Sequence, residues 1–180
     1  MIDKILKFNE QFVAKELYKP YVTTKYPEKK IAIVSCMDTR LTELLLAALG
    51  LKNGDVKLIK NAGGVVMSPF DSTIRSLLVG IYELDVREIM IVGHTDCGAQ
   101  HLDSEEIIKK MLDRGISRDR INMMKYCGIN FEQWLCGFNS LEKAVSESVQ
   151  LVANHPLIPA DVKVRGFVID SITGKLAEIL

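Results

Sequence analysis

Four short runs of β-branched and other apolar residues mark the strands that the sequence predicts. They cover residues 31–35, 56–60, 88–92 and 164–169, and each has the length and composition of a strand. The first three are almost continuously apolar. Such runs are typical of strands that are buried on both faces of a parallel sheet.

Segments with apolar residues at helical spacing separate these runs. Residues 41–49 are apolar on almost every side, which predicts a buried helix. A second helix is expected to have Ser68 as its N-cap and Pro69 at its first position. Its apolar stripe consists of Phe70, Ile74, Leu77, Leu78 and Ile81.

A third helix is predicted after Ser140, which is a suitable N-cap. Its apolar stripe consists of Leu141, Ala144, Val145, Ser148, Val149 and Val152. Between the second and third helices, residues 102–138 predict polar helical turns containing Gly115 and Gly128. The C-terminal segment predicts a turn at residues 173–174 followed by a short strand.

The alternation of strands and helices predicts an α/β fold, with a mostly parallel central sheet flanked by helices. With 180 residues and neither an internal repeat nor a linker-like segment, the chain is expected to form a single domain over residues 1–180. Residues 1–20 are expected to form an amphipathic N-terminal helix.

Charge and hydropathy narrow the functional classes. The 23 basic and 23 acidic residues balance, so bulk electrostatics give no reason to expect binding to nucleic acid or to an anionic membrane. No apolar run approaches the roughly 20 residues of a membrane span, and the N-terminus lacks the apolar core of a signal peptide. We therefore expect a soluble, cytoplasmic protein.

Chemically active residues follow each of the first three predicted strands. These segments are residues 36–40 (CMDTR), 61–64 (NAGG) and 93–98 (GHTDCG). Parallel strands present their carboxyl ends at one edge of a sheet, where ligands bind in such folds. The three segments are therefore expected to converge on one site.

Cys36, His94 and Cys97 in these segments form a donor set that suits zinc, which favours tetrahedral sulfur and nitrogen ligands. Three protein ligands leave a fourth position free, as in catalytic zinc sites, and predict one zinc ion per chain. Zinc lowers the pKa of a bound water molecule to about 7 and so supplies hydroxide near neutral pH. Two thiolates weaken this acidification, so we expect an alkaline working range.

Asp38 and Arg40 are spaced so that the carboxylate can lie beside the metal and the guanidinium beside the carboxylate. Asp38 either orients the zinc-bound water or binds zinc directly and closes the site. A bidentate contact with Arg40 favours the first arrangement. The backbone of Ala62, Gly63 and Gly64 either borders the substrate pocket or forms only a tight turn.

The other histidine and cysteine side chains near the motifs have simpler explanations. His101, Cys127 and Cys136 are interpreted as noncatalytic residues. Taken singly, Cys36 would be a core thiol, His94 a structural histidine, and Asp38 with Arg40 a surface ion pair. Their combination at three predicted strand ends is what favours a zinc site.

The segments CMDTR at 36–40 and GHTDCGA at 93–99 resemble the two signature segments of β-class carbonic anhydrases, and NAGG at 61–64 resembles the glycine loop between them. The resemblance implies a β-carbonic anhydrase fold and the reversible hydration of carbon dioxide to bicarbonate. It also implies that Cys36, His94 and Cys97 bind zinc and that Asp38 and Arg40 control its fourth position. A homodimer or a dimer of dimers is implied as well, with residues 1–20 packed on the partner subunit.

The sequence departs from the family pattern at several positions. The glutamine that plant-type members carry before the first zinc cysteine is missing. Lys60 stands where arginine is common, and Ile33 stands where bicarbonate-regulated members have tryptophan, so a noncatalytic bicarbonate pocket is not expected. Two alternatives stay open: the same zinc site acting on carbonyl sulfide or carbon disulfide, and a closed zinc-binding protein without turnover.

Overall fold

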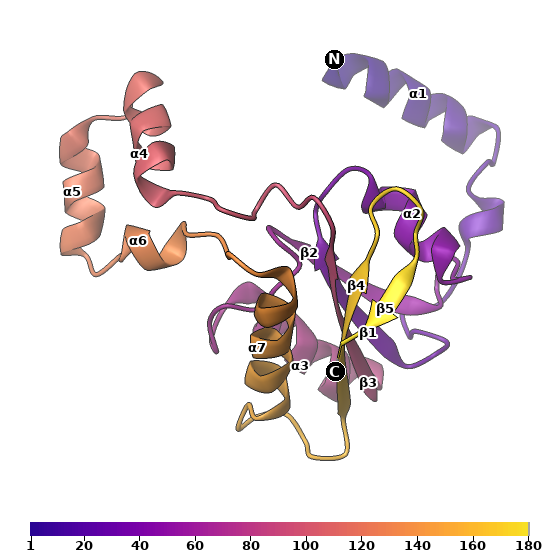
Figure 1. The fold of residues 1–180 in the computed structure, drawn as a ribbon. Coiled ribbons are helices and arrows are strands. Elements are labelled where there is room, and N and C mark those ends of the chain that lie inside the picture. The colour runs from indigo at the N-terminus through magenta and orange to yellow at the C-terminus, as the bar shows by residue number, and fades with distance from the viewer. Residues whose placement is uncertain (180) are drawn as a thin grey trace.

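A five-stranded sheet with the order β2-β1-β3-β4-β5 forms the centre of the computed structural model, which describes residues 1–179 (Figure 1). β1 pairs in parallel with β2 and β3, β3 pairs in parallel with β4, and β5 is antiparallel to β4. The mostly parallel sheet predicted from the sequence is confirmed. The strands are β1 Ile31–Cys36, β2 Val56–Asn61, β3 Glu88–His94, β4 Lys163–Ile169 and β5 Leu176–Glu178.

The register of the parallel strands brings their carboxyl ends to the same edge. Cys36, the last residue of β1, lies opposite Asn61, the last residue of β2. Ser35 lies opposite Val92, so β3 extends past this point to end at His94. The loops that follow β1, β2 and β3 therefore start side by side.

Helices cover both faces of the sheet. On one face, α3 and α7 pack against Ala32, Val34 and Ile91 of the strands; on the other, α2 packs against Ile33 and Val92. The helices are α1 Ile2–Ala14, the short 3-10 helix η1 Lys19–Tyr21, α2 Leu41–Ala48, α3 Ser72–Leu84, α4 Ser104–Asp113, α5 Arg118–Tyr126, α6 Phe131–Trp134 and α7 Leu141–Ala153.

The predicted α7 stripe is confirmed, because all six of its residues are buried and Ser140 caps the helix. Burying a valine or leucine side chain contributes about 1.5–3 kcal/mol relative to leaving it exposed, so this stripe fastens α7 to the sheet. The predicted turn and short strand at the C-terminus are also found, as β5. Leu180 lies outside the described residues.

Two details of the predicted helices are wrong. The side chain of Asp71, not of Ser68, caps α3, by accepting a hydrogen bond of 2.9 Å from the Ile74 amide. The helix therefore begins beyond Pro69, and Phe70 is 80% exposed rather than part of the buried stripe. In α2, which covers the sheet with one face only, Leu41 and Leu45 are buried while Glu43 is exposed.

Two helical segments extend away from the sheet (Figure 1). The predicted turns within residues 102–138 form α4, α5 and α6, which together project as an arm. At the other end of the chain, α1 stands clear of the sheet and, within the described residues, buries none of its side chains. No helix in residues 1–179 is both long enough and apolar enough to cross a membrane.

Candidate metal centre

Cys36, His94 and Cys97 lie together at the carboxyl edge of the sheet. Cys36 ends β1, His94 ends β3, and Cys97 lies in the turn that follows β3. All three side chains are buried, and their ligand atoms lie within 4.8 Å of one another. The two sulfur atoms are 3.8 Å apart. Two sulfur donors and one imidazole match the ligands of tetrahedral zinc sites.

The ring of His94 is oriented to offer Nε2 to this cluster. Nδ1 lies 2.8 Å from the carbonyl oxygen of Thr95, to which it can donate its proton. Nε2 then carries the lone pair, and it is a buried atom without a hydrogen-bond partner in residues 1–179. Because buried polar atoms are normally paired and metal-binding histidines are oriented by such a second hydrogen bond, the residues fit a metal ion.

The two thiols differ in acidity. Burial raises the pKa of the Cys36 thiol, but the neighbouring His94 side chain and hydrogen bonds from the backbone amides of Asp38 and Gly63 outweigh burial and lower the pKa to about 7. Burial raises the pKa of Cys97 to about 11, and the neighbouring charge of Cys36 contributes to this shift. Metal binding requires thiolates, so Cys36 is the thiol more ready to bind a cation near neutral pH.

The carboxylate of Asp38 lies beside the cluster and is held by Arg40. Nε of Arg40 donates to Oδ1 of Asp38 at 3.0 Å, and Nη2 donates to Oδ2 at 2.8 Å. The Arg40 backbone amide donates to Oδ1 as well. Oδ2 is 3.9 Å from Nε2 of His94. The hydrogen bonds from Arg40 hold the pKa of Asp38 well below its usual range, so the carboxylate is charged at neutral pH.

Asp96 is a second partner of Arg40 that the sequence reasoning did not single out. Its Oδ2 accepts a hydrogen bond from Nη1 at 2.7 Å, and its backbone oxygen accepts one from Nη2 at 2.7 Å. Asp96 lies between His94 and Cys97 in sequence, and Arg40 follows Cys36 closely. The guanidinium therefore links the two loops that carry the candidate ligands.

The side chain of Lys60 forms hydrogen bonds with the loop between β1 and α2. Its Nζ lies 3.0 Å from the carbonyl oxygen of Cys36 and 3.3 Å from that of Leu41, so it binds both ends of the loop that carries Asp38. Burial lowers the pKa of Lys60. A lysine within an otherwise apolar strand could have indicated this structural role, but from the sequence Lys60 is only a departure from the family pattern.

The glycine loop packs against the end of β1. Gly64 has φ +67°, and a Cβ there would lie 2.7 Å from the Cys36 backbone nitrogen, so only glycine fits. Gly63 is buried, and its amide faces the Cys36 sulfur. Ala62 is exposed and borders a hollow of about 510 Å³ that extends to Trp134 of α6. Contact of these three residues with substrate stays a prediction.

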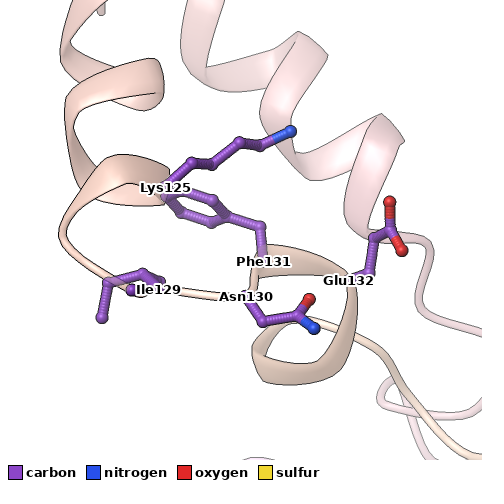
Figure 2. Close-up of a pocket in the computed structure, with 6 residues that line it drawn as sticks. Lys125, Ile129, Asn130, Phe131 and Glu132 are labelled. Atoms are coloured by element: carbon purple, nitrogen blue, oxygen red, sulfur yellow. The ribbon is translucent and has the colours of Figure 1, made fainter.

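The other residues considered from the sequence lie outside the cluster. His101 is exposed, with Nδ1 3.3 Å from Oδ1 of Asn139. Cys127 is exposed and Cys136 is partly buried. A hollow of about 360 Å³ on the arm, lined by Lys125 and residues 128–132, contains no thiol or imidazole (Figure 2). The noncatalytic role of His101, Cys127 and Cys136 stays a prediction.

Comparison with known proteins places this fold and cluster in a family. The family model described as "Carbonic anhydrase" matches residues 31–176. The chain is 49% identical over 179 residues to the Bacillus subtilis (strain 168) protein named "Putative carbonic anhydrase YvdA", covering 99% of this chain and 91% of the relative. It is 29% identical over 156 residues to "Carbon disulfide hydrolase" of Acidithiobacillus thiooxidans, covering 82% and 76%.

Solved structures agree with the sequence comparison. The crystal structure of β-carbonic anhydrase isoform I from Trichomonas vaginalis superposes with a TM-score of 0.89 at 34% identity, covering 100% of this chain and 97% of that one. The sheet, the site-forming loops and the sequence thus lead to one assignment: the chain belongs to the β-carbonic anhydrase family of enzymes.

Proposed function

We propose that this protein catalyses the reversible hydration of carbon dioxide to bicarbonate with one zinc ion held by Cys36, His94 and Cys97. The observation that carries the proposal is the buried pair of thiols and imidazole, with an Arg40-bound Asp38 carboxylate beside it, in a chain of the β-carbonic anhydrase family. When bound, zinc supplies Lewis-acid chemistry that lowers the pKa of a coordinated water molecule to about 7.

The protein's own residues bind the metal and orient the attacking water. Three protein ligands would leave one tetrahedral position of zinc for water, and Asp38 would accept a hydrogen bond from that water. Arg40 neutralises the charge of Asp38 and holds both carboxylate oxygens, which opposes direct binding of Asp38 to the metal and so opposes the closed, noncatalytic alternative.

Asp38 does not serve as the proton acceptor in this scheme. Hydration converts carbon dioxide and water into bicarbonate and one proton, which must leave the site. Because Arg40 holds the pKa of Asp38 well below its usual range, the carboxylate retains no proton at neutral pH. The proton therefore passes to solvent or buffer, and turnover is expected to depend on buffer concentration.

Carbon disulfide hydrolysis is the second candidate function. It is favoured by the relatives of that name at 29% identity, and both substrates are linear molecules attacked at carbon. The same residues would act in the same roles. Zinc content alone therefore does not distinguish the two activities, and a direct comparison of substrates is needed.

The test is stopped-flow carbon dioxide hydration from about pH 6.5 to about pH 9, on protein of measured zinc content, with carbon disulfide hydrolysis measured in parallel. We expect carbon dioxide turnover that rises with pH, because the attacking water must lose a proton and two thiolates raise the pH at which it does so. Carbon disulfide turnover alone would favour the second candidate. No turnover of either substrate at one zinc per chain would favour a noncatalytic protein.

We also propose that the protein is a homodimer or a dimer of dimers and that α1 contacts the partner subunit. α1 has a stripe of exposed apolar side chains, and covering them would remove apolar surface from water. The stripe consists of Ile2, Ile5, Leu6, Phe8 and Val13.

Replacing Ile5 and Leu6 together with aspartate is expected to weaken the dimer, because burial of each such side chain contributes about 1.5–3 kcal/mol. Light scattering after size-exclusion chromatography measures the mass at a series of concentrations. Lys7→Asp lies on the polar side of α1 and makes the same change in net charge, so it controls for charge. An assembly that both variants leave intact would contradict the role of α1.

A further inference from the structure

We propose that Asp96 is a positioning residue that holds the Arg40 guanidinium and thereby keeps the Asp38 carboxylate fixed beside the metal ligands. The test of this inference by enzyme activity rests on the proposed function, whereas its test by the absorption spectrum of bound cobalt does not. Asp96 is assigned no contact with metal or substrate. It is inferred to act through Arg40 and then through Asp38.

The contacts of Arg40 carry this inference. The guanidinium donates to Oδ1 and Oδ2 of Asp38 and to Oδ2 and the backbone oxygen of Asp96. These contacts use four of the five N–H donors of an arginine. Asp38 accepts from Nε and Nη2 on one edge of the guanidinium, and Asp96 accepts from Nη1 and Nη2 on another edge. Both the plane and the position of Arg40 are therefore fixed from two loops.

The backbone at Asp96 supports a specific role for its side chain. Its φ is +52°, in the left-handed region where aspartate is tolerated better than most residues but glycine fits with less strain. This conformation turns the Asp96 carbonyl toward Arg40, and the carboxylate adds an anionic acceptor that glycine lacks. The side chain is 86% exposed, so its ion pair contributes little to stability; its effect is expected on the geometry of the site.

Without the Asp96 carboxylate, Arg40 keeps its contacts to Asp38 and one hydrogen bond, from Nη2 to the backbone oxygen of residue 96. Its side chain is 38% exposed, so the Arg40–Asp38 pair can pivot about that one hydrogen bond relative to the loop after β3. Oδ2 of Asp38 is 3.9 Å from Nε2 of His94, and a small displacement therefore changes its position relative to the ligand atoms. Such a displacement changes the orientation of the Asp38 carboxylate while leaving all three candidate metal ligands in place.

Asp96→Gly tests the proposal with the backbone conformation retained. We expect one zinc per chain, an unchanged or slightly higher melting temperature, and a kcat/KM lowered about tenfold, as for other losses of orientation near a metal site. Asp96→Asn keeps a neutral acceptor and tolerates the same φ, so it should restore part of the loss. A kcat/KM for Asp96→Gly equal to that of the wild type would overturn the proposal.

A double-mutant cycle with Asp38→Ala separates positioning from general damage. If Asp96 acts through Asp38, adding Asp96→Gly to Asp38→Ala should lower kcat/KM no further. An equal loss in both backgrounds would mean an independent structural effect and would overturn the proposal.

Cobalt-substituted protein gives a readout that does not depend on turnover. The visible absorption bands of Co²⁺ report the arrangement of groups around the metal. We expect them to differ between the wild type and Asp96→Gly but to coincide between Asp38→Ala and the double variant. Identical spectra of the wild type and Asp96→Gly would overturn the proposal, whether or not the protein hydrates carbon dioxide. A lack of carbon dioxide hydration would contradict only the proposed function.

Discussion

Replacing Cys36 with serine is expected to remove the metal and the activity together. A serine hydroxyl has nearly the size of the thiol, but it does not ionise near neutral pH and is a poor zinc ligand. Only His94 and Cys97 would remain, one fewer than the three protein ligands of a catalytic zinc site. The variant is therefore expected to bind zinc weakly, and His94→Ala should behave in the same way.

The expected loss of activity is large. Removing residues that only orient metal ligands typically costs 10- to 100-fold in affinity or activity, so removing a ligand should cost more than about 100-fold. Zinc content per chain and carbon dioxide hydration, measured on the same samples, check this result. The matched control is Cys127→Ser, which changes an exposed thiol outside the cluster and should leave both quantities unchanged.

The same substitution should lower thermal stability. A metal ion that binds only to the folded state raises the free energy of unfolding. The melting temperature of the wild type should therefore fall when a chelator removes zinc, whereas that of Cys36→Ser should respond little. A Cys36→Ser protein that retains one zinc per chain would show that another residue completes the site.

The strands and the cluster could be predicted because they depend on local pattern and on one rule of topology. The continuous apolar runs of β1 and β3 identified buried strands, and parallel strands present their carboxyl ends together. Cys36 and His94, each at the end of its strand, then had to lie close. This reasoning required no knowledge of the loops.

What could not be predicted depends on contacts between loops. The Arg40–Asp96 ion pair joins residues 56 positions apart, and its formation depends on the left-handed backbone at Asp96, which no spacing reveals. The predicted start of α3 is wrong because Ser68, which precedes Pro69, and Asp71 are both suitable N-cap residues. In the structure, Asp71 is the cap, because its side chain accepts the hydrogen bond from the Ile74 amide. The projection of the α4–α6 arm depends on packing that the polar sequence of residues 102–138 does not specify.

Asp38→Ala is expected to separate metal binding from catalysis. The three candidate ligands remain, so we expect one zinc per chain, as in the wild type. The activity should nevertheless fall by about 100-fold, the size of effect expected when the reacting atoms lose their correct orientation. Asp38→Asn is the matched variant, since it keeps the size and one oxygen acceptor but loses the charge that Arg40 binds.

The pH profile of Asp38→Ala gives a second, independent result. Because Arg40 holds the pKa of Asp38 well below its usual range, Asp38 stays ionised in the wild type throughout the neutral range, and its own titration cannot produce a rise of activity with pH. Removing the carboxylate takes away a negative charge and leaves the cation of Arg40 paired with Asp96 alone, and both changes favour deprotonation of the attacking water. The residual activity should therefore rise at a lower pH than in the wild type. Full turnover in Asp38→Ala, or an unmoved midpoint, would show that the carboxylate does not contact that water and that the Asp38–Arg40 pair serves only to hold the loop.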